Sequence, residues 1–340
     1  MSHLVFTHRL SPGFGFRCSR FLLLLLAFVA ISGLSVATTF AAEGKSAAEH
    51  VEAAAPGVHG EHAEEHHGLT TFAPPIFWGI GGDAATKKLG PFAMTNSMIV
   101  TWIVAIGLII FAQVATRQIK DVPDGAQNFW EWLVESLHNF LESIIGHDLI
   151  KKTFWFFATL FIFIFFTNWA GLFPGVGTIG WGTPTPQGGL EHITTPLFRG
   201  VNADLNMTLA MATIFFACWI WWAISANGFG GFIMHIFGPK GHTQGFMKVM
   251  MTIVFALVGV LEVVSIMFRP VSLSFRLYGN VFAGENMLES MSMIVPGLSW
   301  LIPVPFYFME LLVGLVQALV FMLLTAVFTL LICQHEEGHH

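Results

Sequence analysis

The residues most able to do chemistry are ionisable side chains that fall inside long apolar stretches of the last third of the sequence. They are Glu262, Arg269, Arg276, Glu285, Glu289 and Glu310. An ionised group at bilayer depth costs roughly 2.5–3.5 kcal/mol on insertion scales. Charges near the end of a span can reach the interface, so Arg269 and Glu289 are the weakest functional candidates. Arg276 lies far from either end and stays charged, so it must face protein or a water-filled cavity.

Helical spacing gives these groups an arrangement. At about 100° per residue, Asn280 lies one turn beyond Arg276, and Glu262 falls within about 40° of the same face. Glu285 lies about 13 Å further along the axis than Arg276, on the opposite face if the helix is regular. Two glycines in this stretch leave that regularity open. One helix is thus predicted to carry a fixed cation with an acid on either side.

The next apolar stretch carries two more polar groups, Glu310 and Gln317. They are seven residues apart and therefore share a helix face. If the two helices are antiparallel and Gln317 is level with Arg276, then Glu310 comes level with residues 281–285. The carboxyl groups of Glu310 and Glu285 could then share or relay a proton.

The composition predicts a membrane around these groups. Hydrophobic residues make up 54% of the chain and charged residues 11%, whereas soluble proteins carry about 25% charged residues. Five apolar runs reach the length of about 20 residues that a spanning helix needs. They are residues 97–116, 153–174, 205–226, 250–293 and 305–333. The fourth contains Arg269-Pro270, so it is either two segments or one long, tilted helix, and the fifth is also long enough to tilt.

Loop charges predict how the spans are oriented. Lys and Arg flank residues 117–152 and 228–248, whereas the loops at 175–203 and 294–303 carry only Arg199. The positive-inside rule then places the first two loops and the tail, residues 334–340, in the cytoplasm, and the N-terminal segment outside. Between the first two spans, residues 128–145 have the spacing of an amphipathic helix that lies in the interface or docks on a partner.

The N-terminal residues predict export. In residues 1–42, three arginines precede an apolar core and Thr39-Phe40-Ala41 follows it, which is typical of a signal peptide, although an uncleaved anchor also fits. Residues 43–75 are rich in Ala, Glu, Gly and His and predict a disordered external linker. Its histidines could bind a metal loosely or form a pH-responsive solvated segment. The polytopic membrane domain is then 76–333.

Other functional classes are less well supported. A secondary ion transporter, the main alternative, predicts internal repeats with broken helices, and the sequence has no convincing repeat. The spans carry no metal-binding or nucleophile motif of an enzyme, and the three cysteines are scattered. We therefore expect no cofactor and no metal. No basic run indicates nucleic acid.

Residues 269–285 read RPVSLSFRLYGNVFAGE and closely resemble the signature of subunit a of the F-type ATP synthase membrane sector. The resemblance extends back to Leu261-Glu262 and forward to Gln317, with weaker matches at 168–174 and 203–208. It covers roughly residues 97–333. The resemblance implies an all-α subunit of the bacterial inner membrane whose last two spans form an antiparallel hairpin. The implied partners are a ring of c subunits, which the hairpin faces, and a b-subunit peripheral stalk.

The resemblance also implies roles. In that family the arginine at the position of Arg276 separates two aqueous half-channels, and the positions of Glu262, Asn280, Glu285 and Gln317 line them. The position of Glu310 often holds His in bacterial relatives, so this chain keeps an ionisable group but changes its sign. A proton would enter by Glu310 and Glu285, neutralise a ring carboxylate, and be released past Arg276 toward Glu262. Asp204 and Asn206 would lie near the outer channel, or Asp204 would be the N-cap of the third span.

Overall fold

The computed structural model describes most of the predicted membrane domain. The described residues are 75–77, 94–173, 176, 179–184, 190–237, 246–294, 298 and 300–333. Its helices are α2 Asn96–Thr116, α3 Gly125–Ile145, α4 His147–Gly171, α5 Leu205–Phe237, α6 Phe246–Ile294 and α7 Pro303–Cys333. The predicted targeting segment, the linker up to residue 74 and the tail 334–340 lie outside the described residues.

Five of the helices in the described ranges are long and apolar enough to cross a membrane, namely α2, α4, α5, α6 and α7. They coincide with the five predicted apolar runs, which confirms an all-α membrane protein. The largest difference at a helix end is at α5, which ends at Phe237 rather than at residue 226, and the largest at a helix start is at α4, which begins at His147 rather than at residue 153. Gly146, at φ 78°, separates α3 from α4 there. Hydropathy marks where a helix becomes apolar, whereas the backbone break at this glycine marks where it begins.

α6 is one continuous helix through Arg269-Pro270, which decides between the two possibilities left open by the sequence. Pro270 removes one backbone donor and is normally unfavourable inside a helix, but the remaining hydrogen-bond ladder and the packing hold the helix together. At 49 residues, α6 is about 74 Å long. A hydrocarbon core is about 30 Å thick, so α6 must tilt or extend beyond it.

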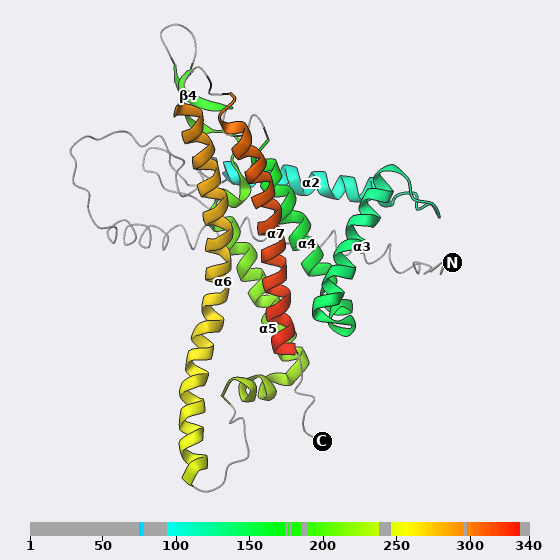
Figure 1. The fold of residues 1–340 in the computed structure, drawn as a ribbon, viewed down its shortest axis with the longest axis vertical. Helices are drawn as coiled ribbons and strands as arrows, with labels where there is room; N and C mark the ends of the chain where they lie inside the picture. Colours follow the sequence, from blue (N-terminus) through cyan, green and yellow to red (C-terminus); the bar gives the residue numbers. More distant parts are fainter. Residues whose placement is uncertain are drawn as a thin grey trace, which may run out of the picture.

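The last two helices form the predicted antiparallel hairpin. Figure 1 shows α6 and α7 side by side, joined at the end of the molecule where β4 lies. α5 packs on α6, and α4 packs on α7. α5 bends at Gly228, whose φ of 70° and ψ of 163° are not helical, so its first straight part ends close to the predicted residue 226. α2 runs across the direction of α6 and α7 in Figure 1.

Short elements that the sequence did not predict occupy the connections. β1 (Pro75–Phe77) pairs antiparallel with β2 (Met94–Thr95), and β4 (Gly180–Pro184) pairs antiparallel with β5 (Leu190–Pro196). A single 3-10 turn, η1 (Val201–Ala203), follows β5 and leads into α5. η1 contacts α2, α4, α5 and α6, so this connection is part of the packed bundle.

The core lies among α4, α5 and α7, and α6 is its least covered element. Fully buried side chains there include Phe157, Phe215, Trp219 and Met322. α3 is amphipathic as predicted, and its buried face packs on α4 within the chain. In the most apolar segment of α4, 56% of the residues are buried within the chain. In the corresponding segment of α6, only 17% are buried. The described part of the chain therefore leaves most of the apolar surface of α6 uncovered.

Candidate functional site

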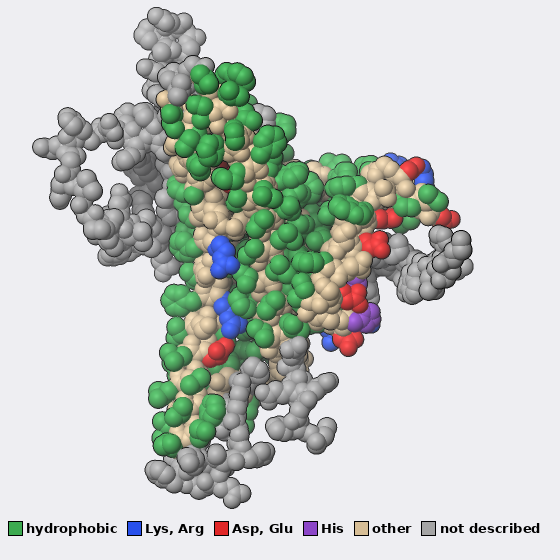
Figure 2. Space-filling model, in the orientation of Figure 1, with side chains coloured by type: hydrophobic (Ala, Val, Ile, Leu, Met, Phe, Trp, Pro, Cys, Tyr) green, Lys and Arg blue, Asp and Glu red, His purple; other side chains and the backbone are tan. Residues whose placement is uncertain are grey.

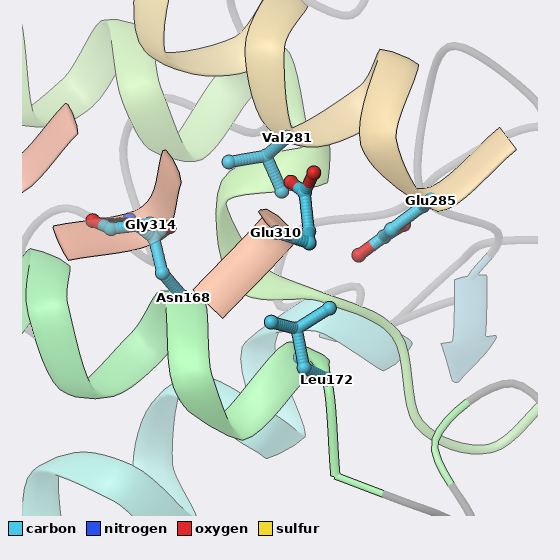
Figure 3. A pocket seen from close by; sticks show the side chains of 7 residues that line it. Asn168, Leu172, Val281, Glu285, Glu310 and Gly314 are labelled. Carbon is cyan, nitrogen blue, oxygen red and sulfur yellow. Dashed lines mark hydrogen bonds between the residues drawn. The ribbon is translucent and has the colours of Figure 1, made fainter. Parts of the chain in front are cut away.

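Glu285 of α6 and Glu310 of α7 line one small pocket, which we call the acid pocket. Its other lining residues are Asn168, Gly171, Leu172, Val281 and Gly314. Figure 3 shows the two acidic side chains entering this pocket from different helices. Glu310 is only 6% exposed. The structure thus brings Glu310 level with Val281 and Glu285, the register that the antiparallel hairpin predicted.

Two glycines let the acids lie against bare backbone. A Cβ atom at Gly284 would overlap the carboxyl group of Glu310, and a Cβ atom at Gly200 would overlap Oε1 of Glu285. A Cβ atom at Gly171 would lie 3.6 Å from the same Oε1. The contact at Gly171 would be an ordinary one, so it is the absence of a side chain at Gly200 and Gly284 that makes the space in which the carboxyl groups lie.

Oε1 of Glu285 is buried and accepts no hydrogen bond from any residue that the structure describes. A buried acceptor without a donor costs about 1–3 kcal/mol, and more when it is charged. Taking up a proton, or accepting a hydrogen bond from water, would remove that cost. Glu285 is therefore chemically suited to exchange a proton.

A chain of amide hydrogen bonds runs beside the acid pocket. Nδ2 of Asn202 donates to Oδ1 of Asn168 at 2.7 Å and to Oγ1 of Thr167 at 2.9 Å. Nδ2 of Asn168 in turn donates to the carbonyl oxygen of Gly314 at 2.9 Å. These side chains connect η1, α4 and α7 inside the bundle. The sequence did not single out Asn202, because nothing in its loop indicated that it would be buried.

A buried arginine lies next to this chain of amides. Arg199 is 2% exposed, donates to the carbonyl oxygen of Ala203 at 3.1 Å, and interacts electrostatically with Asp204 and Glu285. The sequence treated Arg199 only as a loop charge. The sequence offered one signal, since Arg199 is the only Lys or Arg between residues 175 and 203.

Asp204 is the N-cap of α5, one of its two predicted roles. Its Oδ1 accepts the backbone N–H of Asn206 at 3.0 Å, and its Oδ2 accepts the hydroxyl of Ser97 at 2.7 Å. Burial raises the pKa of the Asp204 carboxyl above its usual value, while these hydrogen bonds and the Arg199 charge act against that rise. Asp204 thereby fixes the start of α5 against α2.

Arg276 and Asn280 lie on the opposite face of α6 from Glu285, and both are exposed. Neither makes a hydrogen bond or an ion pair with any described residue, and half-buried Gln317 does not bond to Arg276 within that part of the chain. Figure 2 shows basic and acidic side chains in line along α6, among hydrophobic ones. Among the described residues, Arg276 therefore has no polar partner.

Glu262 has a partner that the sequence did not predict. Its Oε1 lies 3.1 Å from Nη2 of Arg269. The guanidinium of Arg269 lies over the rings of Trp219 and Phe328. Aromatic faces from α5 and α7 thus provide a site for the cation within the bundle.

These features define a class of protein, namely a polytopic membrane protein with a permanent charge and buried acids inside its spans. Such residues are typical of proteins that move ions. Residues 98–329 match the family model described as ATP synthase A chain. The chain is 31% identical over 260 residues to ATP synthase subunit a of Gloeobacter violaceus, an alignment that covers 76% of this chain and 92% of that protein. It is 29% identical over 235 residues to ATP synthase subunit a of Helicobacter pylori strain Shi470, covering 69% and 88%. The chain belongs to this ATP synthase subunit a family.

Proposed function

We propose that the chain is the stator subunit of the membrane sector of an F-type ATP synthase. It provides two half-channels for protons and couples their flow to rotation of a c-subunit ring, while a b-subunit stalk holds it in place. The observation that carries the proposal is that Arg276 is exposed on α6, an apolar helix that the described chain leaves largely uncovered. The acid pocket lies on the opposite face of the same helix. The family membership supports the same conclusion.

The acid pocket forms the outer half-channel. The orientation from loop charges places the start of α7, and Glu310 with it, toward the outside. A proton arriving there passes between the carboxyl groups of Glu310 and Glu285 and on to a carboxylate of the ring. The bonded amides of Asn168 and Asn202 hold the wall of this path, and the unmet oxygen of Glu285 receives the proton.

Arg276 acts on the ring carboxylate from the other face of α6. A neutral, protonated carboxyl can face lipid at low cost, whereas the ionised form is stabilised beside a permanent cation. A proton that has travelled round the ring is therefore released when its carboxyl reaches Arg276. Asn280 and Gln317 line the neighbouring polar surface, and Glu262 lies toward the cytoplasmic exit. One charge that crosses 100 mV yields about 2.3 kcal/mol for this rotation.

ATP-driven acidification of membrane vesicles tests the proposal. We expect Arg276→Ala to abolish acidification while the ATP synthase complex still assembles, because the releasing charge is gone. Arg117→Ala is the matched control, since it removes an exposed arginine of the loop after α2. Acidification that is independent of Na⁺ would identify the proton as the coupling ion. Normal acidification by Arg276→Ala would refute the proposal.

A further inference from the structure

The guanidinium of Arg269 is held between two neighbouring helices. Its central carbon lies 4.8 Å from the ring centroid of Phe328 on α7 and 5.7 Å from that of Trp219 on α5. Trp219 is itself fixed, because it is 1% exposed and its indole N–H donates to the carbonyl oxygen of Phe328 at 3.0 Å. A planar guanidinium can stack on such faces while its N–H groups at the edge remain free to donate.

One of those edge N–H groups donates to Glu262. The two residues lie seven positions apart on α6, so they share one face and are about 10 Å apart along the axis. Glu262 is the more exposed of the two, with 47% of its side chain accessible against 21% for Arg269. An exposed glutamate would otherwise sample several rotamers, so the stacked arginine selects the one that points along α6.

The two arginines on this face of α6 differ in whether they have a counter-charge. Arg276 follows Arg269 by seven residues, so both arginines project from nearly the same side of α6. Arg269 has the carboxylate of Glu262 as a counter-charge, whereas Arg276 forms no ion pair within the described part of the chain. The pair is neutral as a unit, which leaves Arg276 as the uncompensated charge of this face.

We propose that Arg269 is a positioning residue that acts through Glu262. Clamped by Trp219 and Phe328, it holds the carboxylate of Glu262 in one place on the face that carries Arg276. Since Glu262 lies toward the exit in the proposed function, on which this inference rests, the clamp fixes the group that a departing proton meets. Arg269 itself neither accepts nor donates the proton.

The competing explanation is that Arg269 only pins α5, α6 and α7 together. A double-mutant cycle separates the two explanations, because a residue that acts through Glu262 has no effect once the pair is already broken. Glu262→Asp is the suitable partner variant. It keeps an acid on the exit path but shortens the side chain, so that the carboxylate no longer reaches Arg269.

The measurement is the initial rate of ATP-driven acidification of membrane vesicles, divided by the amount of assembled ATP-hydrolysing complex. We expect Arg269→Gln and Glu262→Asp each to slow acidification about fivefold, the size of a typical coupling between contacting groups. The double variant should be no slower than Glu262→Asp alone. Arg269→Lys, which keeps the charge but not the planar stack, should fall between wild type and Arg269→Gln. Arg117→Gln serves as the control for loss of an arginine.

Two results would overturn the inference. One is a double variant whose rate falls by the product of the two single effects. That result is expected if Arg269 only holds the three helices together. The other is a wild-type rate for either single variant. If Arg269→Gln fails to assemble, Phe328→Leu takes its place in the same cycle, since it removes one stacking face and leaves both charges. Arg276→Ala keeps the two proposals apart, because normal acidification by that variant refutes the proposed function whatever the cycle shows.

Discussion

Two groups on α6, nine residues apart, have opposite surroundings. Glu285 faces a pocket that the chain builds by itself from α4, α7 and the turn before α5. Arg276 projects from the other face, where the described chain gives it neither a hydrogen bond nor an ion pair. The described chain therefore builds the acid pocket by itself, whereas in the proposed function the c-subunit ring supplies the other half of the site at Arg276.

The energetics of the two sides differ in the same way. Beside Glu285, bare glycine backbone gives the carboxyl group room, but the nearby amides bond to other groups, so Oε1 of Glu285 remains a buried acceptor without a donor. At Arg276 a permanent charge on an apolar face would cost roughly 2.5–3.5 kcal/mol if lipid covered it. That cost is removed when an acidic or water-lined partner surface covers the face, as a c-subunit ring would.

The largest predicted effect comes from changing Arg276. Arg276→Lys should lower ATP-driven acidification by at least about a hundredfold, which corresponds to the loss of about 2.7 kcal/mol of stabilisation. An ammonium group can lose its proton when it is desolvated, and it lacks the planar fork that meets a carboxylate. The rate in vesicles with equal amounts of complex checks this. Near-normal acidification by the lysine variant would show that any cation suffices at this position.

The next effect concerns the pocket side. Glu285→Gln keeps the size and polarity of the side chain but removes its ability to carry a proton, so acidification should fall about tenfold or more. Glu135→Gln is the control, because this exposed acid of α3 does not line the acid pocket. Equal rates in the two variants would remove Glu285 from the proton path.

A smaller effect tests whether the pocket depends on bare backbone. Gly284→Ala adds a Cβ atom where the carboxyl group of Glu310 lies, and overpacking of this kind costs about 1–3 kcal/mol. We expect acidification to slow about fivefold, since displacing Glu310 disturbs its alignment with Glu285. Gly107→Ala in α2 is the control, because nothing lies within 4 Å of its added Cβ atom. Unchanged rates in Gly284→Ala would mean that the position of Glu310 does not matter.

Much of this arrangement could be predicted from the sequence because it depends on local periodicity. The spans follow from apolar length, and the placement of Glu310 beside Glu285 follows from helical register in an antiparallel hairpin. The pairing of Glu262 with Arg269 could not be predicted, because the aromatic rings that hold the arginine come from distant helices. The burial of Arg199 was missed for a similar reason, since hydropathy does not determine the path of a loop between two spans.

The central claim is that Arg276 keeps two proton paths apart, and passive proton flow tests it most directly. Vesicles that carry the Arg276→Ala complex are given a potassium diffusion potential in the absence of ATP, and proton uptake is recorded beside wild type. The account predicts faster passive uptake than in wild type together with no ATP-driven acidification, because the barrier between the paths has gone. Passive uptake that falls below the wild-type rate would contradict it, because Arg276 would then be a step on the path.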